Sequence, residues 1–433
     1  MSGDTRRRKK TMSPIAITLC LLLFVIILFV TEKLPLAVTS MIALMVLVLT
    51  GVLSPKDAFA GFVDTNLILF VAMFIIGGAF FETGMANKVV GIVTKFAKTE
   101  RQLIVAVMLV TGIMSGFLSN TGTAAILIPV VIGIASKSGF SRSRLLLPLI
   151  FAAAMGGNLS IIGAPGNLLG KSALEQVGQD LGFFEYGYVG LPILLIGTAF
   201  FATVGHRFLP TKQGQTGESI YDKTPDFSQV PAWKQKMSLI VMVLTIIAMI
   251  FEKQIGIKFY LSGCIGALVL VATNVISEKQ AYVSIDLQTL FVYGGTLALA
   301  KALSKTGAGK AIADTVIGTL GQNASPMVLL AVILLLSCVM TNFMSNFGTA
   351  ALLIPISINI SQAMGADPKA VIVATVIGAS LAFATPIGMP ANMMVFAPGG
   401  YNFNDYVKAG LPMVIIGYIT SLILLPILFP FYP

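Results

Sequence analysis

Charged residues are scarce in this sequence. Only 11% of its 433 residues are Asp, Glu, Lys or Arg, and 56% are hydrophobic, whereas a soluble domain carries about a quarter charged residues. Such a chain cannot be an ordinary soluble domain. Apolar segments that suit a bilayer core about 30 Å thick recur from Pro14 to the C-terminus. The composition therefore predicts a multi-pass protein integral to the cell membrane, with the lipid bilayer as its solvent.

Histidine and cysteine are nearly missing as well. His206 is the only histidine, which excludes HExxH zinc sites, and a Ser-His-Asp triad unless this residue alone supplies the base. The three cysteines lie inside apolar segments without a CxxC or Cys/His spacing. Paired carboxylates and a nucleophile–base set are not visible in the sequence. We therefore expect a protein that is not an enzyme and has no cofactor.

Carboxylates are missing from the middle of the apolar segments. The acidic residues nearest to the membrane interior all stand at the ends of predicted spans: Asp64, Glu82, Glu252 and Asp286. A proton pump or proton-coupled antiporter usually needs a buried Asp, Glu or His, so this class is disfavoured. The net charge is +10, but the basic residues lie in loops rather than on one soluble face, so we expect no nucleic-acid partner.

The chain contains an internal repeat. Four pairs of segments match in the same order: residues 118–129 with 344–355, 163–167 with 388–392, 190–192 with 410–412, and 82–84 with 305–307. One match could be chance, but four matches in order indicate a duplication.

The duplication predicts two homologous halves and a polar linker between them. Residues 1–14 form a basic tail, 15–210 the first repeat, 211–233 the linker and 234–433 the second repeat. In the first repeat we expect scaffold helices over 15–100, a helical hairpin and a broken helix over 101–185, and a last helix over 186–210. An amphipathic stretch over 87–98 is expected in the membrane interface. The second repeat should have its hairpin over 326–362 and its broken helix over 369–397.

Each half is predicted to cross the membrane five times, with three spans before the hairpin and two after it. The hairpin itself adds either no crossing or two, so the number of crossings stays odd. Because five is odd, the second half must be inverted relative to the first. The predicted fold is therefore an all-α polytopic membrane protein with two inverted-topology repeats, each with about five transmembrane helices plus a helical hairpin and one interrupted helix. Inverted repeats with interrupted helices are typical of secondary transporters.

The two hairpin tips and the two interrupted helices place polar backbone inside the membrane. Such breaks are tolerated only where protein or a water-filled cavity surrounds them, so we expect the four to converge near the centre. Unwound helix ends offer carbonyls to a hard cation and N–H groups to an anion. A cation bound by neutral oxygens brings net charge into the core, and an anionic substrate beside it offsets the cost. Sodium with an anion is the pairing that this chemistry favours.

Two asparagines are the most informative residues of the breaks. A buried amide is costly unless paired, so Asn120 and Asn346 at equivalent positions of the repeat favour a shared polar site over simple packing. For small residues such as Gly112 and Gly116, close helix packing is the favoured interpretation.

The hairpin tips Ser119-Asn120-Thr121 and Ser345-Asn346-Phe347 resemble those of the divalent anion:sodium symporter family, the INDY-like carriers of dicarboxylates, citrate and sulfate. Residues 31–39 and 384–392 also look like signatures of that family, and the resemblance covers nearly the whole chain. It implies a homodimer in which a transport domain of hairpins and broken helices moves as an elevator against scaffold helices.

The resemblance also implies the binding residues. The first sodium site would involve Ser115, Ser119 and Asn120 with the backbone near Gly163, and the second would involve Thr341, Ser345 and Asn346 with the backbone near Gly388. The substrate would lie between the tips, held by Asn120, Thr121, Ser345 and Asn346, with Pro165 and Pro390 close by.

The sequence departs from the family pattern at two of these places. Phe347 replaces the hydroxyl residue of the second tip and removes a partner for a substrate carboxylate, which admits a smaller anion or one with an apolar side. Gly166 stands where the family usually has a second proline. Our hypothesis is sodium-coupled symport of small anions, dicarboxylate or sulfate-like. The alternatives are a sodium-independent anion exchanger of the same fold, or an ion or proton antiporter or arsenite-type permease.

Overall fold

The computed structural model describes residues 12–31, 33–88, 99–212, 227, 229–320 and 325–432. Throughout these ranges the regular structure is helical, with no strand, as the predicted all-α fold requires. Most of the basic tail, most of the polar linker and most of the amphipathic stretch over 87–98 lie outside the described residues.

The helices of the first half include one hairpin, formed by α6 and α7, and one broken pair, formed by α8 and α9. Their bounds are α1 Pro14–Thr31, α2 Leu36–Leu49, α3 Pro55–Phe59, α4 Thr65–Glu82, α6 Glu100–Ser115, α7 Asn120–Ser138, α8 Ser143–Gly156, α9 Pro165–Glu175 and α10 Gly187–Thr203, with short 3₁₀ turns η1 Ala60–Val63, η2 Gly157–Leu159 and η3 Gly205–Phe208.

The second half repeats the hairpin as α17 and α18, and the broken pair as α19 and α20. Its helices are α11 Ala232–Ile250, α12 Glu252–Ile255, α13 Phe259–Ala272, α14 Glu278–Val283, α15 Leu287–Thr306, α16 Ala308–Leu320, α17 Pro326–Thr341, α18 Asn346–Ala363, α19 Pro368–Ser380, α20 Pro390–Gly399 and α21 Phe403–Leu428.

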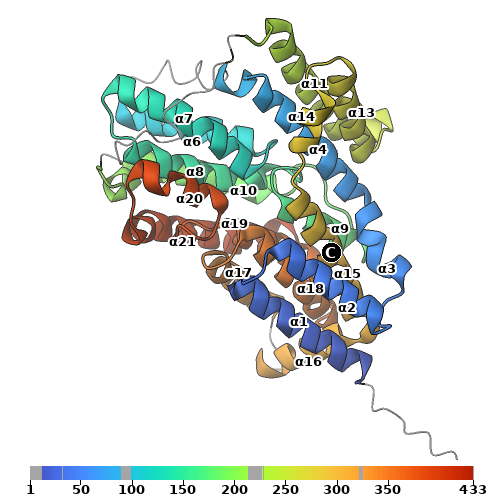
Figure 1. Cartoon of the computed structure of the whole chain (residues 1–433). Coiled ribbons are helices and arrows are strands. Elements are labelled where there is room, and N and C mark those ends of the chain that lie inside the picture. Colours follow the sequence, from blue (N-terminus) through green and yellow to red (C-terminus); the bar gives the residue numbers. More distant parts are fainter. Residues whose placement is uncertain are drawn as a thin grey trace, which may run out of the picture.

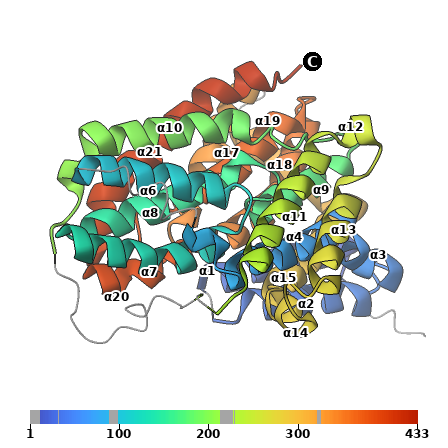
Figure 2. The same ribbon diagram turned by 90° about the horizontal axis from the view of Figure 1, so that it is seen from above.

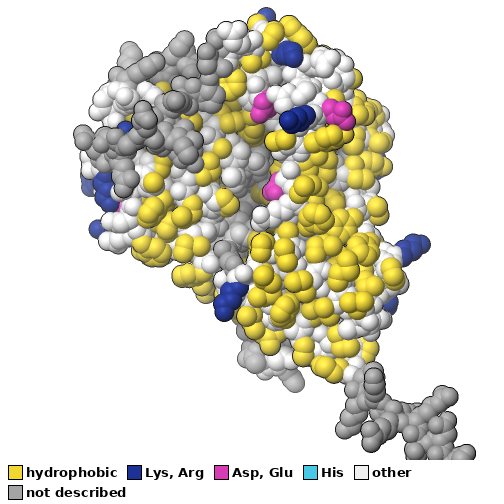
Figure 3. Space-filling view, viewed as in Figure 1, with side chains coloured by type: hydrophobic (Ala, Val, Ile, Leu, Met, Phe, Trp, Pro, Cys, Tyr) yellow, Lys and Arg dark blue, Asp and Glu magenta, His cyan; other side chains and the backbone are white. Residues whose placement is uncertain are grey.

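Four helical units among the described residues are long and apolar enough to cross a membrane: Pro14–Thr31, Pro55–Glu82, Ala232–Ile250 and Phe403–Leu428. Further apolar helices, including α7, α8, α17 and α19, are shorter because the tips and breaks interrupt the chain. In Figure 3, hydrophobic side chains cover much of the visible surface. On α1, for example, Leu23 and Ile27 are 58% and 51% exposed. A surface of this kind suits contact with lipid, in agreement with a multi-pass membrane protein.

The helices form two groups, one on each side of a central region. Figures 1 and 2 show α6, α7, α8, α10, α20 and α21 on one side, and α3, α4, α11, α13 and α14 on the other. Helix α9 lies at the junction and packs against α4 and α15 as well as α18 and α19. Helix α9 of the first broken pair therefore joins the second hairpin and the second broken pair, through α18 and α19, to α4 and α15.

The duplication is visible as matched packing. Helix α6 packs on α8 as α17 packs on α19, and α7 packs on α8 as α18 packs on α19. The Ser115 hydroxyl donates to the Ala153 carbonyl oxygen across the first pair, and the Thr341 hydroxyl donates to the Ala379 carbonyl oxygen across the second. Each half therefore builds the same local unit, while the opposite membrane orientation of the two units stays a prediction.

The repeated Gly-Leu-Pro segments bring a helix against each break. A methyl group on Gly190 of α10 would lie 2.3 Å from the Asn158 carbonyl oxygen, and one on Gly410 of α21 would lie 1.9 Å from the Phe383 carbonyl oxygen. Both distances are far below van der Waals contact, so only glycine allows these helices to touch the backbone. This close packing holds the chain in place just before each broken helix resumes.

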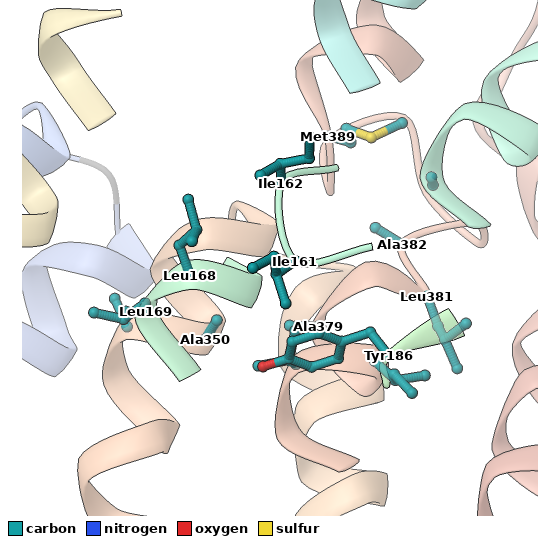
Figure 4. Close-up of a cluster of buried hydrophobic side chains, with 14 of the residues drawn as sticks. Ile161, Ile162, Leu168, Leu169, Tyr186, Ala350, Ala379, Leu381, Ala382 and Met389 are labelled. Atoms are coloured by element: carbon teal, nitrogen blue, oxygen red, sulfur yellow. The ribbon is translucent and has the colours of Figure 1, made fainter. Parts of the chain in front are cut away.

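Apolar side chains surround the two breaks. Figure 4 shows Ile161 and Ile162 of the first break near Leu381, Ala382 and Met389 of the second. All five are at most 3% exposed. The unwound backbone is thus enclosed by protein rather than lipid, as the membrane interior requires.

Candidate substrate and cation site at the hairpin tips

A cavity of about 490 Å³ lies where the hairpin tips and broken helices meet. Figure 3 shows a hollow between the two helix groups. The cavity wall includes every residue expected from the sequence to contact substrate: Asn120, Thr121, Pro165, Ser345, Asn346 and Pro390. The four breaks therefore meet at one cavity, and Phe347 of the second tip lines it too.

Four helices begin at the cavity wall. Helices α7 and α18 begin at Asn120 and Asn346, and α9 and α20 begin at Pro165 and Pro390. Proline suits the first position of a helix because its ring fixes φ and its missing N–H would have no helical partner. The N-terminal ends of helices carry partial positive charge and free N–H groups, so this arrangement favours an anion in the cavity.

Serine caps the two helices that start at the hairpin tips. The Ser119 hydroxyl accepts a hydrogen bond from the Gly122 N–H at 3.1 Å, and the Ser345 hydroxyl accepts one from the Gly348 N–H at 3.0 Å. Each hydroxyl therefore caps the N-terminus of the helix that follows its hairpin turn. Both serines were expected as sodium ligands, and in the described structure their hydroxyls act as helix caps at the cavity wall.

A cluster of oxygen atoms surrounds one end of the Asn120 amide, which is 9% exposed. That end lies 2.8 Å from the Ser115 hydroxyl oxygen, 3.1 Å from the Ala153 carbonyl oxygen and 3.2 Å from the Gly163 carbonyl oxygen. Of the residues expected at the first sodium site, Ser115, Asn120 and Gly163 are thus brought together. The Ala153 carbonyl was not expected, because a backbone oxygen has no signature in the sequence.

The second half repeats this cluster around Asn346. One end of its amide lies 3.0 Å from the Thr341 hydroxyl oxygen, 2.8 Å from the Gly388 carbonyl oxygen and 3.3 Å from the Ala379 carbonyl oxygen. The residues expected at the second sodium site, Thr341, Asn346 and Gly388, therefore also meet. The same arrangement is therefore present in both halves of the repeat.

When the amide oxygen lies inside a cluster, the cluster has too few protons to give each of its oxygens a hydrogen bond. In the first cluster, Ser115 has a single hydroxyl proton, and its hydroxyl oxygen lies 2.7 Å from the Ala153 carbonyl oxygen and 2.8 Å from the Asn120 amide. One proton cannot screen four oxygens from one another. Either the amide nitrogen points inward and donates to the oxygens, or a cation lies among them.

A second pair of asparagines holds the broken helices in shape. The Asn167 side-chain nitrogen donates to the Gly157 and Ser160 carbonyl oxygens, both at 2.7 Å. In the second half, Asn392 donates to the Ala382 and Thr385 carbonyl oxygens at 2.8 and 2.9 Å. No role was predicted for these asparagines, although both belong to the repeated segments 163–167 and 388–392.

Hydroxyl groups tie each break to the neighbouring hairpin. Ser160 donates to the Gly116 carbonyl oxygen, and Thr385 donates to the Asn342 carbonyl oxygen. Since Gly163 and Gly388 follow three residues after these hydroxyls, the ties help to fix the carbonyls that complete each oxygen cluster. The hairpin tip and the broken helix of one half are thus joined by a hydrogen bond in each repeat.

The charged side chains among the described residues of the cavity are all acidic. Among the described residues that line it, none is basic, and the only charged ones are Glu82 and Asp286. Glu82 accepts a hydrogen bond from Gln280 at 3.0 Å, and Asp286 caps α15 through Thr289. Both side chains are exposed. The cavity therefore offers an anion no cationic side chain, only helix ends, amides and hydroxyls.

At the other end of α4, polar contacts join α4 and α15 to α9. The Asp64 carboxylate accepts from the Ser172 hydroxyl at 2.9 Å and from the Tyr293 hydroxyl at 3.0 Å. Asn66 donates to Glu175 at 2.7 Å. The cavity is thus lined by the C-terminal end of α4, while hydrogen bonds tie the N-terminal end of α4 to the broken helix.

Comparison with known proteins identifies the class of protein. The citrate transporter family matches residues 26–378. A transporter of Haemophilus influenzae is 28% identical, over 90% of this chain and 87% of its own. The protein named sodium-dependent dicarboxylate transporter SdcS from Staphylococcus saprophyticus is 24% identical, over 92% of this chain and 84% of its own.

Two solved structures share the fold. The YdaH transporter of Alcanivorax borkumensis superposes with a TM-score of 0.66 at 15% identity, covering 88% of this chain and 89% of its own. MtrF of Neisseria gonorrhoeae superposes with a TM-score of 0.63 at 15% identity, covering 97% and 95%. At such low identity these likenesses show the fold alone. Because the family match spans most of the chain, this protein belongs to the citrate transporter family, within the divalent anion:sodium symporters.

Proposed function

We propose that this protein carries a small divalent anion, a dicarboxylate or a sulfate-like ion, across the membrane together with sodium ions. The observation that carries the proposal is the pair of oxygen clusters beside one cavity at which four helices begin. Carbonyl, amide and hydroxyl oxygens suit a hard cation, and the helix ends suit an anion. One structure therefore supports both ligands side by side.

Sodium coupling follows from the lack of charged groups at the clusters. Because their oxygens are neutral, a bound cation keeps its full charge inside a protein interior of low dielectric constant. The anion has no basic side chain among the described cavity residues. Each ligand thus lacks a protein counter-charge and is stabilised by the other. This mutual dependence is the physical basis of symport.

The substrate is expected to be small or to have one apolar side. Asn120, Thr121, Ser345 and Asn346 can hydrogen-bond an oxyanion, but Phe347 replaces the second hydroxyl that a symmetric pair of tips would offer. The relative SdcS is named a dicarboxylate transporter. A short dicarboxylate satisfies this combination better than a larger tricarboxylate.

Transport itself would proceed by an elevator motion of the unit that holds the cavity. The hairpins and broken helices form the moving unit, and α1 to α4 with α11 to α16 form the scaffold, which we expect to pair in a homodimer. The contacts of Asp64 with Ser172 and of Asn66 with Glu175 cross this junction. They would hold the present state and break during each cycle.

Uptake into proteoliposomes tests the proposal. Labelled succinate or sulfate should accumulate when sodium is higher outside, and potassium should not replace sodium. The Asn120→Ala and Asn346→Ala variants should lose uptake while they keep the thermal stability of a folded protein. Uptake that ignores the sodium gradient but needs internal anion would replace symport with exchange, and uptake driven by pH alone would favour a proton-coupled carrier.

A further inference from the structure

We infer that the side-chain amides of Asn120 and Asn346 rotate by half a turn when sodium binds, and that this rotation makes anion binding depend on sodium. The inference rests on the proposed function and concerns how its two ligands are coupled. It comes from the proton count of the two oxygen clusters, which is the same in both halves.

Without a cation, the amide nitrogen belongs inside the cluster. In the first half its two protons are then donated to the Ser115 hydroxyl and the Gly163 carbonyl, while the Ser115 hydroxyl donates to the Ala153 carbonyl. Each oxygen of the cluster gains a donor. Since unsatisfied buried polar groups are costly, this orientation is the stable one in the absence of sodium.

With a cation, the amide oxygen belongs inside the cluster. A positive ion among these oxygens repels an N–H group and attracts the carbonyl oxygen of the amide. Nitrogen and oxygen occupy nearly the same volume, so the side chain can exchange them by rotation about its last bond without moving the backbone. Sodium therefore competes with the amide nitrogen of the same side chain.

The rotation changes what the cavity offers to an anion. Asn120 and Asn346 also line the cavity, so the amide end that leaves the cluster faces the substrate space. Without sodium this end is a carbonyl oxygen, which repels an anion. With sodium it is an NH₂ group, which donates to it. Since both tips behave alike, full anion binding requires both cations.

Two other asparagines of the chain serve as internal controls for the rotation. Asn167 and Asn392 each donate through the side-chain nitrogen to two carbonyl oxygens of their own break. Rotation would set their side-chain oxygen against those carbonyls with no cation to compensate. These two amides therefore keep one orientation whether or not sodium is present.

Solid-state NMR on the full chain in liposomes tests the rotation. Asparagine side chains are labelled with ¹⁵N and glycine carbonyls with ¹³C, and the dipolar coupling between the labels is compared in sodium and in potassium. In potassium, Asn120 with Gly163, Asn346 with Gly388 and Asn167 with Gly157 should all couple. In sodium the first two couplings should be lost and the third should stay. The Asn120→Asp and Asn346→Asp variants should each remove one sodium-dependent coupling.

Two other outcomes overturn the inference in distinguishable ways. If the couplings are the same in both salts while sodium still raises the thermal stability and anion binding still needs sodium, the rotation is wrong and the proposed symport survives. If sodium has no effect on stability and the anion binds equally well in potassium, the proposed function fails together with the rotation.

Discussion

The second oxygen cluster gives the most direct test of sodium binding, through the hydroxyl of Thr341. This side chain is fully buried at the end of α17, donates to the Ala379 carbonyl oxygen, and lies 3.0 Å from the Asn346 amide. Thr341→Val keeps the branched shape and removes the hydroxyl. The variant therefore takes one oxygen ligand from the cluster with little change in packing.

The size of the effect follows from what the cluster loses. A hydrogen-bonding partner removed from a buried group costs about 1–3 kcal/mol. At about 1.4 kcal/mol the sodium concentration for half-maximal uptake rises about tenfold. At saturating sodium the maximal rate should stay close to that of the original protein, because the cavity itself is unchanged. Thr341→Ser keeps the hydroxyl and should keep sodium dependence near its original value.

The assay is the initial rate of labelled dicarboxylate uptake into proteoliposomes over a series of sodium concentrations. Thr349→Val is the matched control, since Thr349 is also buried in the same hairpin and its hydroxyl has no hydrogen-bond partner in the described structure. Its sodium dependence should not shift. The reasoning is refuted if Thr341→Val leaves the sodium dependence unchanged, or if Thr349→Val shifts it equally.

Three further predictions concern the substrate, the breaks and the junction. Phe347→Thr restores a hydroxyl at the second tip and should lower the dicarboxylate KM by about fivefold, or roughly 1 kcal/mol, in uptake assays. Gly410→Ala would place a methyl group 1.9 Å from a carbonyl oxygen and should destabilise the protein by about 1–3 kcal/mol or more in thermal unfolding. Gly318→Ala is the control, because its methyl group would meet nothing within 4 Å and should not destabilise the protein. Ser172→Ala removes the hydroxyl that donates to Asp64 and should destabilise the present state of the cavity by roughly 1 kcal/mol. The rate at which a single cysteine introduced in the cavity is labelled from the open side should therefore fall about fivefold. Unchanged labelling would exclude a role of this contact in holding the present state.

The repeat made the location of the site predictable from the sequence. Asn120 and Asn346 occupy matching places in two copies of one segment, and such copies fold alike, so the sequence could indicate that both tips belong to one site. The same matching contained an unused signal. Asn167 and Asn392 close the second matching pair of segments, and their hydrogen bonds to the break explain why an asparagine stands there twice.

Other parts of the site left no trace that a single sequence could show. The Ala153 and Ala379 carbonyls enter the oxygen clusters through their backbone, and any residue type supplies a carbonyl. The contact of Asp64 with Ser172 joins residues more than a hundred positions apart. Hydrophobic periodicity reports which face of a helix is apolar, and it does not report which polar groups will meet across a junction.

The distribution of charge also indicates an order of binding. Glu82 and Asp286 are exposed at the cavity wall, where they attract sodium and repel a dianion. The neutral clusters lie deeper, and without cations they present no positive side chain to the substrate. Under the proposed function, sodium would therefore be drawn in first, and each bound ion would make the cavity more positive for the anion that follows. A carrier built this way would need no arginine or lysine among the described residues of its substrate site, since the cations that it is proposed to carry would supply the charge, and an empty site would then have little affinity for the anion.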